Sequence, residues 1–226
     1  MSAVELEPSL IVKKKASEIS NELKGTSIFL VGMSCSMKTT LGELLADALR
    51  YYYFDSDGLV EQAAGGEAAA KSFRDTDEKG FRDSETEVLK QLSSMGRLVV
   101  CAGDGAVQSS TNLALMRHGI SIWIDVPLDM LANEILKTEA SSTISQATSN
   151  SDTFIEVMEE LSKVYYEMRK GYGTADATVS LEKVAAELGC EDLSTVTAQD
   201  MAIEVLKEIE RLTRVKKMME EAARPF

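Results

Sequence analysis

The sequence is poor in the residue types that build metal centres and disulfide frameworks. It has one histidine among 226 residues, and its three cysteines, Cys35, Cys101 and Cys190, lie far apart. No pair of them has the spacing of metal ligands, and widely spaced cysteines are typical of reduced thiols in an intracellular or organellar compartment. A histidine-rich metal site and a disulfide-stapled fold are therefore excluded.

Long apolar runs and an excess of positive charge are also missing. No run reaches the ~20 residues that a membrane-spanning helix needs, so we expect no membrane insertion. The 37 acidic and 24 basic residues give a net charge of -13, which disfavours nucleic acid as a partner. The N-terminus has no signal-peptide core and is too acidic for a transit peptide, so we expect no targeting peptide in this chain.

The most informative stretch is a phosphate-binding loop motif that has lost a glycine. The intact pattern is a strand, Gly-x-x-x-x-Gly-Lys-[Ser/Thr] and a helix. Gly32, Lys38 and Thr39 stand at the expected positions, but Met37 replaces the second glycine. Backbone N–H groups in such a loop turn toward phosphate oxygens, which glycine permits and larger residues resist. The motif therefore indicates a nucleotide site that has been altered.

The retained residues leave two interpretations open. Lys38 can reach the outer phosphates and Thr39 can bind Mg²⁺, which predicts weak nucleotide binding with Mg-ATP as the candidate cofactor. The alternative is that residues 38–40 only cap the next helix. The apolar run before the motif and the helical pattern after it favour the first interpretation. The predicted nucleotide-binding residues are Gly32, Ser36, Lys38 and Thr39.

Strand and helix patterns alternate along the chain. Strands are predicted at 27–31, 51–54, 98–101, 121–125 and 177–181. Helices are predicted at 39–50, 59–71, 80–94, 111–118, 128–138, 153–170 and 198–222. This alternation predicts an α/β fold with a five-stranded parallel sheet and helices on both faces.

The chain is predicted to have three parts. Residues 1–24 form a partly flexible lead-in, residues 25–215 the main domain, and residues 216–226 a C-terminal tail. Within the domain, a Ser/Thr-rich stretch at about 138–152 is predicted to be a lid-like loop.

Several short motifs follow one another in a fixed order between residues 27 and 212. They are Phe54-Asp55-Ser56-Asp57, Gly80-Phe81-Arg82-Asp83-Ser84-Glu85, Gly103-Asp104-Gly105-Ala106-Val107 and Trp123-Ile124-Asp125-Val126-Pro127-Leu128. In order and spacing they resemble shikimate kinases of plant chloroplasts, including the diverged shikimate kinase-like group. The resemblance implies a P-loop nucleoside-monophosphate-kinase-like three-layer sandwich, a separate shikimate pocket, and a chloroplast (stroma) location.

The resemblance also implies roles for individual residues. Thr39 and Asp55 would bind Mg²⁺, and Asp57 would grip the substrate hydroxyls. Arg82 would pair with the shikimate carboxylate, as a bidentate guanidinium can. The alternative for Arg82 is a surface ion pair with Asp83 or Glu85. Gly103 and Gly105 would complete the substrate pocket.

Four positions depart from the family pattern in the parts of the site that would bind the charged groups of the ligands. Cys35 and Met37 replace loop glycines, and Asp104 puts a carboxylate beside two anionic ligands, which it should repel. Met168 stands where a second substrate arginine is expected, with Arg169 next to it.

The lid arginine is missing as well. The stretch 141–147 holds neither arginine nor proline, and loss of such an arginine can cost ~10³-fold in rate. Together with the resemblance, these departures predict an inactive shikimate kinase-like protein in which no residue is assigned a catalytic role. Its plastid role, chloroplast biogenesis by resemblance, would involve an unknown protein partner. The alternative is an active ATP-dependent kinase of shikimate or another hydroxylated acceptor.

Overall fold

A five-stranded parallel sheet forms the centre of the molecule. The computed structural model describes residues 8–142 and 151–223. The strands are β1 (Ile28–Val31), β2 (Tyr52–Asp55), β3 (Leu98–Cys101), β4 (Ile120–Asp125) and β5 (Ala177–Ser180). Their order is β2-β3-β1-β4-β5, and each neighbouring pair is parallel, which confirms the predicted sheet.

The strands in the middle of the sheet are buried on both faces. Every residue of β1 and β3 is buried, as their unbroken apolar sequences IFLV and LVVC predict. In the register of the sheet, Phe29 of β1 lies beside Val100 of β3 and Ser121 of β4. The carboxyl ends of β1, β3 and β4 therefore meet at one edge, where a ligand site is expected in such sheets.

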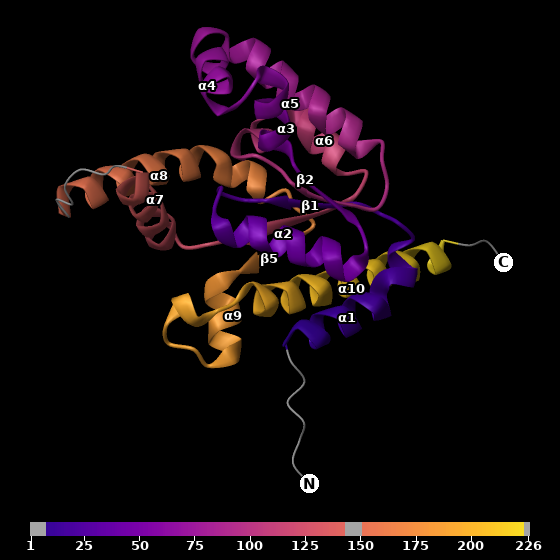
Figure 1. The fold of residues 1–226 in the computed structure, drawn as a ribbon. Helices are drawn as coiled ribbons and strands as arrows, with labels where there is room; N and C mark the ends of the chain where they lie inside the picture. The colour runs from indigo at the N-terminus through magenta and orange to yellow at the C-terminus, as the bar shows by residue number, and fades with distance from the viewer. Residues whose placement is uncertain (1–7, 143–150, 224–226) are drawn as a thin grey trace.

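Helices cover both faces of the sheet, so the predicted three-layer sandwich is confirmed (Figure 1). On the lower side in Figure 1 lie α1 (Pro8–Leu23), α2 (Ser36–Leu49), α9 (Leu181–Leu188) and α10 (Ala198–Ala222). On the upper side lie α3 (Ser56–Ala64), α4 (Glu67–Thr76), α5 (Glu78–Ser93) and α6 (Ser110–Met116). Helices α7 (Leu128–Ser142) and α8 (Ser151–Tyr172) pack together, and the short 3₁₀ segments η1 (Asp104–Gln108) and η2 (Leu193–Thr195) complete the elements.

Three helix predictions differ from the structure. The single helix expected at 59–71 is wrong, because Gly65 and Gly66 have φ angles of 97° and 114° and separate α3 from α4. Helix α9 was not predicted. Helix α2 begins at Ser36, about one turn before the expected start at residue 39.

Helix α1 lies in the stretch expected to be a lead-in, yet it belongs to the core. Its apolar face, Val12, Ala16, Ile19 and Leu23, is buried against the rest of the molecule. Lys15 of α1 also bonds to Glu210 of α10, the helix with which α1 packs.

Two further expectations concern the lid and the membrane. Most of the predicted lid-like loop at 138–152 lies outside the described residues, since α7 ends at Ser142 and α8 starts at Ser151. None of the helices in residues 8–142 and 151–223 combines the length and the apolar character that a membrane crossing needs.

Candidate functional site

A cavity of about 430 Å³ opens at the carboxyl end of the strands. It brings together parts of the chain that the sequence places far apart: the loop after β1, the start of α3, the loop after β3, and α7. Its lining comprises Ser34, Cys35, Lys38, Thr39, Asp55, Asp57, Gly58, Glu61, Cys101, Ala102, Gly103 and Glu134. Five of the predicted binding residues therefore lie around one hollow, namely Lys38, Thr39, Asp55, Asp57 and Gly103.

The loop after β1 is tightly held at its first glycine. Gly32 has a φ of 131°, and a Cβ there would lie 2.3 Å from the carbonyl oxygen of Ile124 in β4. A side chain is excluded on both grounds, because the backbone is strained for L-residues and the space is filled. The first glycine of the motif is thus required by the fold itself.

Cys35 and Met37 cause none of the backbone strain that the lost glycines led us to expect. Cys35 is extended, with a φ of -161°, and its sulfur caps α2 by accepting the Lys38 N–H at 3.4 Å. Met37 lies in the first turn of α2 and packs against the core. Because α2 starts a turn early, these residues adopt helical or extended angles that any side chain tolerates.

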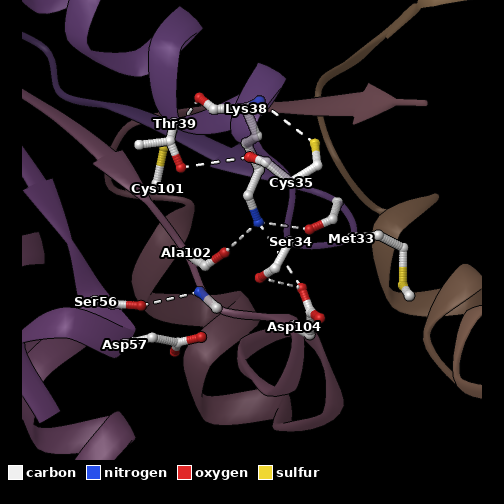
Figure 2. A network of polar contacts seen from close by, with 12 residues as sticks. Met33, Ser34, Cys35, Lys38, Thr39, Ser56, Asp57, Cys101, Ala102 and Asp104 are labelled. Carbon is white, nitrogen blue, oxygen red and sulfur yellow. Dashed lines mark hydrogen bonds and ion pairs between the residues drawn. The ribbon is translucent and has the colours of Figure 1, made fainter. Parts of the chain in front are cut away.

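Lys38 is turned back into the protein. Its side chain is only 4% exposed. Its Nζ donates to the carbonyl oxygens of Gly32 at 2.6 Å and Ala102 at 3.0 Å (Figure 2). Asp104 Oδ1 lies 3.9 Å from the same Nζ and also accepts the Ser34 hydroxyl at 3.0 Å. The lysine that the motif assigns to phosphate is therefore surrounded by oxygen atoms of its own chain.

Glu134, which the sequence analysis did not select, contacts the same loop. Its carboxylate on α7 accepts the Ser36 N–H at 2.7 Å and the Ser36 hydroxyl at 2.9 Å. The topology contained a signal for this contact, because β4 neighbours β1 and α7 follows β4 at the same edge. The carboxylates of Glu134 and Asp104 therefore both contact the loop that the motif assigns to phosphate.

The residues expected in the substrate pocket lie beside the glycines of the loop after β3, and two of them, Asp57 and Gly103, line the cavity. Asp57 packs on Gly103, where a Cβ would lie 1.8 Å from the carboxylate, and Ser56 accepts the Gly103 N–H at 2.9 Å. A Cβ at Gly105 would similarly lie 1.8 Å from an Arg82 nitrogen. The structure thus places Asp57 against Gly103 and Arg82 against Gly105.

Arg82 is already paired. One of its terminal nitrogens donates to both carboxylate oxygens of Glu85, at 3.1 Å and 2.9 Å. The Glu85 side chain is 7% exposed and that of Arg82 33% exposed. This is the ion pair that the sequence left open as the alternative role of Arg82, and it lies partly inside the protein rather than on the surface.

The side chains of Thr39 and Asp55, the predicted Mg²⁺ ligands, both form hydrogen bonds with the backbone at the start of a helix. Asp55 Oδ1 accepts the N–H groups of Asp57 and Gly58, at 3.0 Å and 3.1 Å, and so caps α3. The Thr39 hydroxyl donates to the Cys35 carbonyl at 3.4 Å. In the described part of the chain, no group of three or more His, Cys, Asp or Glu side chains is arranged to hold a metal.

Crowded carboxylates and burial shift the acid–base behaviour of the cavity. Burial, then the nearby charges of Glu85 and Asp104, raise the pKa of Asp57 to about 6. Burial also raises the pKa of the Cys35 thiol, and that of Cys101 to about 11. Both thiols are therefore protonated near neutral pH and poorly nucleophilic.

Met168 and Arg169 lie on different faces of α8. Met168 is 6% exposed and belongs to the hydrophobic core. Arg169 is exposed and lies near Asp125. Burial raises the pKa of the Asp125 carboxyl, and the positive charge of Arg169 partly opposes that rise. The one-residue step on the helix thus points Arg169 away from the core position of Met168.

The comparisons with known proteins agree with this fold and motif order. The family model described as Shikimate kinase matches residues 34–191. An Arabidopsis thaliana protein named "Probable inactive shikimate kinase like 1, chloroplastic" is 60% identical over 226 residues, covering 100% of this chain and 77% of that protein. Rice (Oryza sativa subsp. japonica) Shikimate kinase 2, chloroplastic, is 43% identical over 205 residues, covering 91% of this chain and 67% of that protein.

A solved structure shows the same fold at lower identity. The shikimate kinase from Acinetobacter baumannii in complex with shikimate has a TM-score of 0.63 and 23% identity, covering 87% of this chain and 97% of that chain. Both plant relatives are chloroplastic by name, which confirms the predicted chloroplast location. Together the family match, the extent of the identity and the shared sheet show that this chain belongs to the shikimate kinase family.

Proposed function

We propose that this chain is a non-catalytic member of the shikimate kinase family that acts in the plastid stroma through a protein partner. One observation carries the proposal: the groups that should hold phosphate, the Lys38 ammonium and the Ser36 N–H, are bonded to oxygen atoms of the chain itself. The name of the Arabidopsis relative, which describes it as inactive, supports the same conclusion.

The charge of the cavity argues against phosphoryl transfer. This reaction depends on positive charge around the moving phosphoryl group. Among the described residues that line the cavity, Lys38 is the sole cation, while Asp55, Asp57, Glu61 and Glu134 are acidic. A triphosphate would meet like charge on most sides, so binding of Mg-ATP, as the motif alone predicts, would be weak at best.

The role that remains is one of recognition. The sheet, its helical layers and the first loop glycine are all retained, so the chain keeps a well-packed core. Among the described residues of its cavity, it lacks the positive charges that a kinase places around phosphate. By resemblance to the kinase-like group, this role would belong to chloroplast biogenesis. A protein with this fold can have a recognition role without catalysing a reaction, because fold alone does not determine function.

The test of this proposal is ADP release from Mg-ATP with saturating shikimate. Rice Shikimate kinase 2 is the positive control, and the folded state of this chain is established first by its thermal unfolding transition. We expect turnover at least ~10³-fold below the control, the scale of losing one charge-stabilising group. Turnover near that of the rice enzyme would overturn the proposal.

A second candidate function is an active kinase with a different acceptor. Asp57 favours it, because a carboxyl with a pKa near 6 can accept a proton from a hydroxyl near neutral pH. A panel of hydroxylated metabolites, with ADP release as readout, tests this candidate. Release with any one of them would support it, and no release from folded protein would count against it.

A further inference from the structure

The beginning of α2 shows where the anion-binding groups of this chain are used. A helix starts with backbone N–H groups that have no partner inside the helix, and with a positive dipole end. In a phosphate-binding loop these groups face the ligand. Here Glu134 accepts the Ser36 N–H at 2.7 Å, and the Cys35 sulfur accepts the Lys38 N–H at 3.4 Å. The backbone N–H groups of residues 36 and 38, which face phosphate in such a loop, therefore have partners within the chain.

The side chains of the loop are used in the same way. The Ser36 hydroxyl donates to the second oxygen of Glu134 at 2.9 Å, and the Ser34 hydroxyl donates to Asp104 at 3.0 Å. Figure 2 shows Asp104 facing Ser34 and the Lys38 ammonium from the loop after β3. Two carboxylates from separate elements, α7 and η1, thus approach the loop from two sides.

We propose that Glu134 and Asp104 are built-in anionic ligands of this loop and that they exclude phosphate groups from it. This inference rests on the proposed non-catalytic function and gives it a structural cause. Glu134 takes the larger part, because its two oxygens accept two donors of one residue and it lies at the positive end of α2. Asp104 adds a negative charge beside Lys38.

The exclusion has a structural consequence for α7. In this chain α7 is joined to the start of α2 by the Glu134 carboxylate, across 98 residues of sequence. The contact needs no bound nucleotide. The Ser36 amide should therefore be protected from hydrogen exchange in the protein alone.

Titration with inorganic pyrophosphate, followed by calorimetry, tests the exclusion. We expect no binding to the unaltered protein at millimolar pyrophosphate. Glu134→Ala should bind at least about tenfold more tightly than the unaltered protein, and Glu134→Ala with Asp104→Gly more tightly still. Glu134→Gln removes the charge but keeps an acceptor, so its gain should be smaller.

Glu61→Ala is the matched control. Glu61 lines the same cavity and carries the same charge, but no hydrogen bond joins it to the loop. If repulsion by the whole acidic cavity were the cause, Glu61→Ala and Glu134→Ala would gain equally, and that result would overturn the inference. Pyrophosphate binding to the unaltered protein would overturn it too.

Hydrogen exchange of the Ser36 amide gives a readout that does not depend on any ligand. Exchange should be slow in the unaltered protein and in Glu61→Ala, and faster in Glu134→Ala. Equal exchange in all three would contradict the internal contact. Failure here is distinct from failure of the proposed function, which would appear as turnover of ATP with shikimate by the unaltered protein.

Discussion

The two halves of the cavity differ in how they hold their charged groups. In the phosphate half, around the start of α2, the Ser34 and Ser36 hydroxyls, the Ser36 N–H and the Lys38 ammonium are bonded to Asp104, Glu134 and backbone carbonyls of the chain itself. In the acceptor half, Asp57 packs on Gly103 and Arg82 on Gly105, and Arg82 is also paired with Glu85. The acceptor half contains the Asp57 carboxylate, whose pKa burial and neighbouring acids raise to about 6.

This difference shows that a site can lose its ligand without losing its structure. In the phosphate half, hydrogen bonds within the chain use the groups that would bind a ligand. These hydrogen bonds contribute to the stability of the folded state. The acceptor half has internal bonds too, but it also keeps an electrostatic cost at Asp57. Mutations in the first half should therefore reduce stability, whereas removal of charge in the second should increase it.

The largest effect is expected for Gly32→Ala in the phosphate half. Its Cβ would lie 2.3 Å from a backbone oxygen of β4, which cannot move aside without disturbing the sheet. We expect a loss of about 3 kcal/mol or more in the free energy of unfolding, measured by urea denaturation. Gly66→Ala is the control: its φ of 114° is also positive, but nothing lies within 4 Å, so it should cost only about 1 kcal/mol. Equal losses would show that the packing at Gly32 is unimportant.

Lys38→Met should come next. The change removes the ammonium from the buried carbonyl oxygens of Gly32 and Ala102, which lose this donor, and takes a positive charge away from Asp104. We expect a loss of about 2–3 kcal/mol in urea denaturation. Lys90→Met, which breaks a surface pair with Glu87, should cost less than about 0.5 kcal/mol. A stable Lys38→Met protein would mean that the lysine is not structural and that the comparison of the two halves fails.

Asp57→Asn should have the opposite sign. The folded state holds the Asp57 proton more tightly than the unfolded state, so this carboxyl destabilises the fold increasingly as pH rises from about 4 to about 6. Near pH 7 the variant should be about 1–3 kcal/mol more stable, and this gain should shrink as pH falls through 6 and vanish below about 4. Urea denaturation across that pH range measures it, with the exposed Asp75→Asn as control. A gain that is constant with pH would refute the electrostatic explanation.

The smallest effect is expected at the cap of α2. Cys35→Ala removes the sulfur that accepts the Lys38 N–H and should cost about 0.5–1 kcal/mol. Cys35→Ser supplies a better cap acceptor and should be neutral or slightly stabilising. Thermal unfolding of the two variants side by side measures the difference. If both destabilise equally, Cys35 contributes by packing and not by capping.

The sheet could be predicted because its signals are local. The runs at 28–31 and 98–101 are apolar without a break, and turn residues and helical patterns separate them. The break between α3 and α4 also had a local signal, the adjacent Gly65 and Gly66, which was not used.

The internal occupation of the phosphate half could not be predicted in the same way. The contact of Glu134 with Ser36 spans 98 residues, and that of Lys38 with the Ala102 carbonyl spans 64. The motif identified the loop and the changed glycines, but it contains no information on which distant acid bonds to the loop. The backbone strain expected at Cys35 and Met37 was also inferred from the local motif. It is not present, because α2 begins at Ser36 and gives Cys35 extended and Met37 helical backbone angles.

Helix α1 bears on how this protein can be shortened. A shortened protein that starts at residue 25 would still contain all the family motifs. It would, however, expose the apolar surfaces of α10 and α2 that Val12, Ile19 and Leu23 cover. Such a chain should aggregate, because a newly exposed apolar surface of this kind favours association. The folding unit therefore extends upstream of the nucleotide-loop strand, and tags or fusions belong ahead of residue 8 and not at the domain boundary that the motifs suggest.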